Sequence, residues 1–211
     1  MRVVKLCADG VLSARARRIA QRLRSALPAS GRLLDVGSGT GHNAAYLRRT
    51  FDFEVVEADV TSMMPDGASP TLFDGEHLPF ADDAFDGVTM SFVLHYAPRP
   101  AQLLAEALRV APRVVILQST YEGRAGWPPG AARTSLAVRD AFMGRLALRM
   151  SNALGYTPAS PASALAPRRL FARHELVAMC RGPGARLLLH DAGEATRFGL
   201  RRELLAIERC P

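Results

Sequence analysis

The chain has 211 residues, of which 48% are hydrophobic and 22% charged, and its formal net charge is +7 at pH 7. This composition predicts one globular domain with a substantial core, and no apolar run approaches the roughly 18–20 residues that a membrane-spanning helix needs. Residues 1–9 are too short an apolar stretch to indicate a signal peptide. The excess of arginine fits either a solvated surface or an affinity for nucleic acid or anionic membranes.

Three cysteines constrain the redox environment. Cys7, Cys180 and Cys210 are odd in number and show no C-x-x-C spacing. This pattern argues against a disulfide framework and against a cysteine zinc site. We therefore expect a reducing, cytoplasmic protein.

Residues 13–27 are predicted to form the first helix. Ser13 can cap it, and Ile19, Leu23 and Leu27 recur on one face, while arginines occupy the rest. Residues 28–31, Pro-Ala-Ser-Gly, end it.

A strand, a glycine loop and a helix follow. Residues 32–36 form a short apolar run, and Gly37, Gly39 and Gly41 then alternate before a helix that reaches about Thr50. Glycines let a ligand approach the backbone, and the helix start attracts anionic groups. The dinucleotide pattern G-x-G-x-x-G fits poorly, because its third glycine falls on His42.

The second predicted strand, residues 53–60, ends in two acids. Glu57 and Asp59 lie about 20 residues beyond the glycines, which is the spacing of an acid that binds ribose hydroxyls in nucleoside-binding α/β folds. A pair of solvated acids at a strand end is the simpler alternative.

Further strands and helices alternate along the chain. Residues 87–96 and 114–117 are predicted strands. Apolar residues recur at helical spacing between them and predict a helix. This alternation predicts a parallel sheet that binds ligands at the carboxyl ends of its strands. The segments that leave those ends carry Gly37, Asp59, Asp74, His95 and Tyr121.

The C-terminal third predicts a loop at residues 122–132, an amphipathic helix at 133–154, a short helix at 173–181, and a closing strand pair at 185–190 and 202–208. Apolar and aromatic side chains here suit a small-molecule ligand with a ring or hydrophobic portion: Tyr121, Trp127, Phe142 and Met143. The basic helix also fits a membrane surface, or a lid packed on the core.

Two motifs carry a resemblance to a known family. D-V-G-S-G-T-G at residues 35–41, and D-G-E-H-L-P-F at 74–80 with D-D-A-F-D at 82–86, resemble the class I S-adenosylmethionine-dependent methyltransferases that act on small molecules. The resemblance implies an α/β, Rossmann-like, seven-stranded and mostly parallel sheet, with helices on both faces and a C-terminal antiparallel hairpin. It implies a single domain, 1–211, with an N-terminal lid helix in 1–30 and a variable acceptor-side loop and helix in 121–170.

The resemblance also implies a cofactor site for S-adenosylmethionine, with S-adenosylhomocysteine as product. Asp35 would fix the glycine loop, Asp59 rather than Glu57 would hold the ribose, and Asp74 would accept from the adenine amino group. The remaining cofactor contacts would come from Gly37, Ser38, Gly39, Thr40, Gly41, Val60, Gly75, Glu76 and Ser91. The five histidines form no compact ligand pattern, so we expect no metal.

The implied reaction moves a methyl group to an oxygen or nitrogen of a small-molecule acceptor, such as a natural product, a quinone-like or a lipid-like compound. His95 is the predicted general base, with His42 as a weaker candidate; Tyr96, Tyr121, Trp127 and Phe142 would contact the acceptor. One alternative is a nucleic-acid methyltransferase, although the chain lacks an RNA-binding domain and the N/D-P-P-Y/F motif. The other is a cofactor-binding protein without catalysis.

Overall fold

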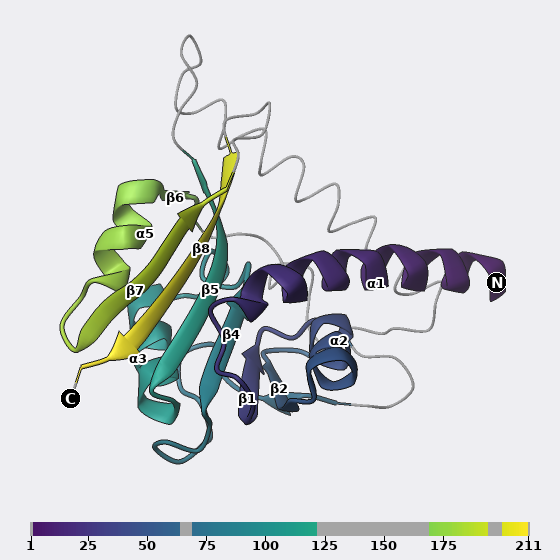
Figure 1. Cartoon of the computed structure of the whole chain (residues 1–211), viewed down its shortest axis with the longest axis horizontal. Helices are drawn as coiled ribbons and strands as arrows, with labels where there is room; N and C mark the ends of the chain where they lie inside the picture. The colour runs from purple at the N-terminus through teal and green to yellow at the C-terminus, as the bar shows by residue number, and fades with distance from the viewer. Residues whose placement is uncertain (1, 64–68, 122–168, 194–199, 211) are drawn as a thin grey trace, which may run out of the picture.

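A twisted sheet forms the centre of the computed structural model, which describes residues 2–63, 69–121, 169–193 and 200–210 (Figure 1). The described strands are β1 Arg32–Val36, β2 Glu54–Asp59, β3 Thr71–Leu72, β4 Gly87–Ser91, β5 Arg113–Tyr121, β6 Phe171–Ala172, β7 Ala185–Ala192 and β8 Leu200–Arg209. The described helices are α1 Arg2–Arg24, α2 His42–Phe51, α3 Pro100–Val110 and α5 Arg173–Cys180.

The sheet has the order β3-β2-β1-β4-β5-β8-β7, and β6 pairs with the end of β5. The first five strands in this order run parallel, whereas β8 pairs antiparallel with both β5 and β7. Their register places Val36 beside Ala58 and Met90, and Ser91 beside Leu117. The carboxyl ends of β1, β2, β4 and β5 therefore share one edge of the sheet, as parallel pairing requires.

Apolar side chains cover both faces of the sheet. One cluster joins α3 and α5 to the strands, and includes Leu104, Leu176 and Ile116. The other joins α1 and α2 to the opposite face, and includes Leu23, Leu47 and Leu117. The predicted mostly parallel sheet with helices on both faces and a C-terminal antiparallel hairpin is confirmed.

Several predicted boundaries were wrong. The strand predicted over residues 87–96 ends at Ser91, because Phe92 adopts a left-handed backbone conformation with φ of 61° and leaves the sheet. The first helix begins at Arg2 rather than at residue 13. The two-residue strands β3 and β6 were not predicted, and β6 makes the described sheet eight-stranded. The predicted loop 122–132 and helix 133–154 lie outside the described residues.

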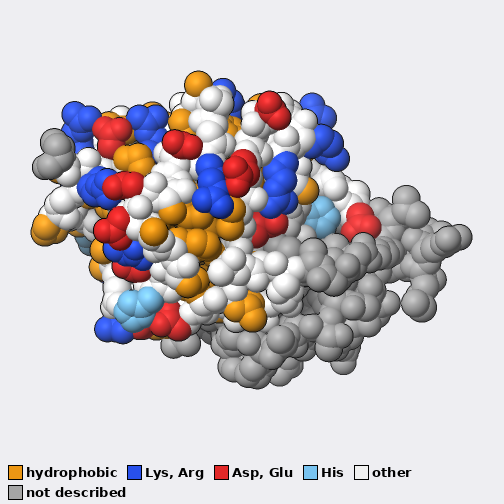
Figure 2. Space-filling model, turned by 90° about the horizontal axis from the view of Figure 1, so that it is seen from below, with side chains coloured by type: hydrophobic (Ala, Val, Ile, Leu, Met, Phe, Trp, Pro, Cys, Tyr) orange, Lys and Arg blue, Asp and Glu red, His pale blue; other side chains and the backbone are white. Residues whose placement is uncertain are grey.

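Charges are mixed on the face seen in Figure 2, where basic and acidic side chains lie interspersed around a strip of hydrophobic ones. Ion pairs join residues at the amino ends of the strands: Arg32 with Glu54, and Arg113 with Glu208. Arg109 pairs with Asp82 in the same way. Basic residues at this edge are thus matched by acids of the same chain.

Candidate cofactor and acceptor site

The glycine loop between β1 and α2 presents bare backbone. Gly37, Gly39 and Gly41 have φ of 70°, 56° and 74°, a region that glycine enters without steric cost. A Cβ at Gly37 would lie 2.4 Å from Cγ2 of Val93, whereas one at Gly39 would meet nothing within 4 Å. The loop is therefore packed on one side and open on the other.

Asp59 ties this loop to the end of β2. Its Oδ2 accepts a hydrogen bond from the Gly39 N–H at 2.8 Å, and its Oδ1 accepts one from the Thr61 N–H at 3.3 Å. Burial raises the pKa of Asp59, and these backbone donors oppose the rise. Glu57 instead pairs with Arg48 of α2 at 2.7 Å. The structure thus places Asp59, and not Glu57, against the glycine loop.

Polar atoms without a partner gather near the same edge. Among the described residues, Asp35 Oδ2, Ser38 Oγ, Thr61 Oγ1 and Ser91 Oγ are buried and make no hydrogen bond. Buried polar atoms are normally paired, so these orphans mark a place where a polar ligand would supply partners. Asp35 also accepts from the Thr89 hydroxyl at 2.7 Å, and burial raises its pKa to about 7.

His42 connects the glycine loop to α1. Its Nδ1 lies 2.9 Å from Oγ1 of Thr40, and its Nε2 lies 3.9 Å from the carboxylate of Asp9 on α1. The N-terminal part of α1 is thereby held beside the loop, where the sequence predicts a lid.

The loop after β3 holds Asp74 in a local turn. Its Oδ1 accepts from the N–H groups of Glu76 and His77, each at 2.7 Å, and its Oδ2 lies 2.8 Å from Nδ1 of His77. The bond to His77 holds the pKa of Asp74 far below its usual range. Glu76 is engaged by Arg99, whose Nε donates at 2.9 Å. Asp74 therefore remains ionised and keeps acceptor capacity at the surface.

An apolar side chain lies next to this turn. Val60 is 41% exposed, and a Cβ at Gly75 would sit 3.3 Å from its Cγ1. An exposed apolar group beside an ionised acceptor is the surface that a flat heterocycle with an amino group needs.

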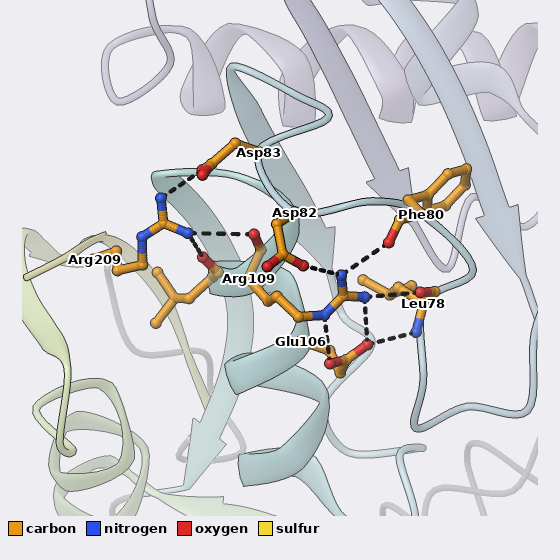
Figure 3. A network of polar contacts seen from close by, with 8 residues as sticks. Leu78, Phe80, Asp82, Asp83, Glu106, Arg109 and Arg209 are labelled. Atoms are coloured by element: carbon orange, nitrogen blue, oxygen red, sulfur yellow. Dashed lines mark hydrogen bonds and ion pairs between the residues drawn. The ribbon is translucent and has the colours of Figure 1, made fainter.

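Arg109 of α3 fixes the chain that follows (Figure 3). Its guanidinium donates to the carbonyl oxygens of Leu78 and Phe80 at 3.0 and 2.9 Å. It also donates to the carboxylates of Asp82 and Glu106. Arg109 of α3 thus holds the Leu78–Phe80 segment in place.

His95 and Tyr96 lie in the turn after β4, with ring centroids 4.0 Å apart. Gln118 of β5, which sequence patterns did not single out, donates from Nε2 to His95 Nδ1 at 2.6 Å. The same amide group donates to the Ser119 carbonyl at 3.4 Å, which sets its orientation. With the Gln118 amide in this orientation, Nδ1 accepts and a neutral His95 carries its hydrogen on Nε2, while Oε1 of Gln118 is buried without a partner among the described residues.

Comparisons with known proteins agree with this geometry. Residues 34–113 match the model of a family described as a methyltransferase domain. The biotin biosynthesis bifunctional protein BioHC of Cellvibrio japonicus is 36% identical over 105 residues, which cover 44% of this chain and 21% of that protein. The ubiquinone/menaquinone biosynthesis C-methyltransferase UbiE of Desulfotalea psychrophila is 31% identical over 93 residues, 39% of this chain and 38% of that protein. The matches thus span less than two-fifths of either relative.

Among solved structures, the geranyl diphosphate C-methyltransferase of Streptomyces coelicolor superposes with a TM-score of 0.64 at 13% identity. The superposition covers 92% of this chain and 80% of that one, so the two share a fold. Residues 34–113 thus match a methyltransferase domain, within a fold shared with S-adenosylmethionine-dependent methyltransferases of known structure.

The family match covers only part of the candidate site. Residues 34–113 contain the glycine loop, Asp59, Asp74 and His95, and they end where β5 begins. Gln118 lies beyond them, as does Glu203, a buried carboxylate that accepts from the Thr120 hydroxyl at 3.1 Å. No periodic signal singles out either residue, because each stands among other polar residues of its strand: Gln118 precedes Ser119 and Thr120, and Glu203 follows Arg201 and Arg202.

Some predicted acceptor residues lie outside the described chain, namely Trp127 and Phe142. Tyr121, at the end of β5, is described, and its hydroxyl is buried without a hydrogen-bond partner. Within the described residues, no group of three or more His, Cys, Asp or Glu side chains is arranged to hold a metal ion. In the same residues, no helix is long and apolar enough to cross a bilayer.

Proposed function

We propose that this chain binds S-adenosylmethionine and transfers its methyl group to an oxygen or nitrogen atom of a small-molecule acceptor. One observation carries the proposal: the open glycine loop is tied to Asp59 through the Gly39 N–H, beside buried polar atoms that lack partners. The curated relatives named above support a small acceptor, since BioHC and UbiE are named for biotin and quinone biosynthesis.

The residues present fit the cofactor. Residues 37–41 would line its methionine end, Asp59 would accept from the ribose hydroxyls, and Asp74 would accept from the adenine amino group beside Val60 and Gly75. When bound, the cofactor supplies an activated methyl group on a sulfonium. The chain's own task is then to orient the acceptor atom at about 3–3.5 Å from that methyl group and to exclude water.

We propose for His95 a part other than the general base that the sequence predicts. A base would need an unprotonated Nε2, but the donor from Gln118 on Nδ1 leaves the hydrogen on Nε2. We propose that His95 offers this N–H to the acceptor as a hydrogen-bond donor, and that orientation supplies most of the rate. An oxygen or nitrogen acceptor suits this arrangement, because such an atom already carries the attacking lone pair.

Calorimetric titration tests the cofactor assignment. We expect S-adenosylhomocysteine to bind to the full chain in a one-to-one complex, and NAD to give no heat of binding, because His42 occupies the third glycine position of the dinucleotide motif. Binding of NAD in place of S-adenosylhomocysteine would overturn the proposal.

A second experiment addresses the acceptor. The chain is incubated with methyl-labelled cofactor and a host extract that is separated into small-molecule, protein and RNA fractions. We expect label in the small-molecule fraction, and NMR of the product then identifies the methylated atom. Label confined to RNA would instead support the nucleic-acid alternative.

A further inference from the structure

Two arginines from distant parts of the chain converge on one aromatic ring. The guanidinium carbon of Arg15, on α1, lies 5.6 Å from the ring centroid of Phe92, and that of Arg202, on β8, lies 5.9 Å from it. Both distances are within the range of cation–π contacts. The ring thus brings together two positive charges at the carboxyl edge of β4.

This pair lacks the carboxylates that match other arginines. Arg22, about two helical turns after Arg15 on α1, pairs with Asp191, and Arg48 of α2 pairs with Glu57. Within the described chain, neither Arg15 nor Arg202 makes an ion pair or a side-chain hydrogen bond that would neutralise it. Partial burial lowers the pKa of Arg15, and the charge of Arg202 lowers it further.

The backbone of Phe92 is strained where it presents the ring. Its φ of 61° is rare for a bulky residue, and its N–H donates to the Leu117 carbonyl at 2.7 Å, which holds it there. Strain of this kind is costly and gathers at ligand sites. The chain therefore maintains an unfavourable conformation that holds an aromatic ring in contact with two unmatched cations.

The pair belongs to the acceptor side of the edge. Phe92 directly follows Ser91 at the end of β4, and Tyr96 is close enough to Arg15 to affect its pKa. Arg202 stands opposite Ser119 of β5 in the antiparallel register. These neighbours are the segments that leave β4 and β5, beyond the loops assigned to the cofactor.

We propose that Arg15 and Arg202 bind an anionic group, a carboxylate or a phosphate, on the methyl acceptor, with the Phe92 ring as the apolar surface beside them. This inference rests on the proposed methyl transfer for its place in the reaction. Guanidinium groups bind such oxyanions through charge-assisted hydrogen bonds, and an anion would relieve the repulsion between the two cations. An acidic small molecule is therefore the substrate class that this edge selects.

The test measures anion binding directly. The full chain, with and without saturating S-adenosylhomocysteine, is titrated at low ionic strength with malonate in one arm and pyrophosphate in the other. We expect one of the two anions to bind, and the arm that responds identifies carboxylate or phosphate chemistry. Arg15→Gln and Arg202→Gln should each weaken that binding roughly tenfold, as loss of a charge-assisted hydrogen bond requires.

Arg17→Gln is the matched control, because it removes the same charge from an exposed position of the same helix. It should leave anion binding nearly unchanged, and all three variants should bind S-adenosylhomocysteine like the unaltered chain. Equal losses in Arg17→Gln and Arg15→Gln, or no binding of either anion, would overturn the arginine site. Failure of S-adenosylhomocysteine to bind would overturn the proposed function instead, and the anion titration without it still decides this inference.

Discussion

The two halves of the carboxyl edge carry opposite charges and are stabilised differently. Beside β1, β2 and β3, the carboxylates of Asp35, Asp59 and Asp74 accept hydrogen bonds from nearby hydroxyl or backbone N–H groups. Beside β4 and β8, Arg15 and Arg202 contact one ring and meet no acid among the described residues. The first half is prepared for a ligand rich in hydrogen-bond donors, and the second for one that brings negative charge.

The largest expected effect comes from the buried acid of the first half. The pKa of Asp35 is raised from 3.8 to about 7, chiefly by burial. Because the folded pKa lies above the unfolded one, Asp35 destabilises the fold increasingly as pH rises from about 4 to about 7, by about 4 kcal/mol in full. Asp35→Asn keeps an acceptor for Thr89 and cannot ionise. The free energy of unfolding of this variant, relative to that of the unaltered chain, should therefore increase as pH rises over this range.

Urea unfolding at a series of pH values measures this gain. Asp52→Asn, at an exposed position with the left-handed backbone that asparagine tolerates, is the control and should show no such trend. A stability difference between Asp35→Asn and the unaltered chain that stays constant from pH 4 to pH 7.5 would contradict a buried ionisation.

Asp59→Ala should have the next largest effect, on cofactor affinity. It removes the acceptor for the Gly39 N–H as well as the proposed ribose contact, and bonds to a charged group contribute about 1.5–3 kcal/mol. We expect S-adenosylhomocysteine to bind roughly ten- to hundredfold more weakly. Glu57→Ala, which breaks only the pair with Arg48, should bind it normally; the reverse ranking in calorimetry would assign the ribose to Glu57.

Gly37→Ala probes the packed side of the glycine loop. Alanine costs about 1–2 kcal/mol in a left-handed conformation, and here its Cβ would also displace Val93. Gly184→Ala shares the positive φ but meets open space. Both variants should lose thermal stability, and only Gly37→Ala should lose affinity for S-adenosylhomocysteine. Partial recovery in the double variant Gly37→Ala, Val93→Ala would confirm the clash.

The smallest effect is expected on the acceptor side. If His95 donates one hydrogen bond to the acceptor, His95→Ala should lower kcat/KM by about tenfold, and His95→Asn, which retains an N–H donor, should recover part of it. Cofactor affinity should be unchanged. A loss of roughly a hundredfold without recovery, together with a rate that rises with pH in the unaltered chain, would instead support the general base that the sequence predicts.

The strand, loop and helix of the proposed cofactor half could be predicted from the sequence because their signals are local. The run from Arg32 to His42 contains a strand, a loop and a helix start within one short stretch, and each has a distinct residue pattern. The spacing from the glycines pointed to an acid at the end of the second strand, and the family resemblance favoured Asp59 over Glu57. Its bond to Gly39 needed the structure, because it depends on how β1 and β2 pair.

The acceptor half was not predictable in the same way. Arg15 belongs to a helix whose arginines all read as solvated, and its proximity to Arg202 arises only when β8 pairs with β5. The strand end at Ser91 was missed because an apolar run does not reveal that Phe92 turns into a left-handed conformation. Gln118 was not singled out because the spacing of hydrophobic residues predicts which positions are buried. It does not predict which side chain a single amide group contacts.

The Arg109 network has a consequence for the thermodynamics of ligand binding. One rigid guanidinium holds two carbonyl oxygens and two carboxylates around the Leu78–Phe80 segment, next to the turn of Asp74. A segment that is already immobilised loses little conformational entropy when a nucleoside arrives. The surface formed by the Asp74 turn and the Leu78–Phe80 segment is therefore preorganised. Binding of the heterocycle there does not have to offset the entropy cost of ordering a loop.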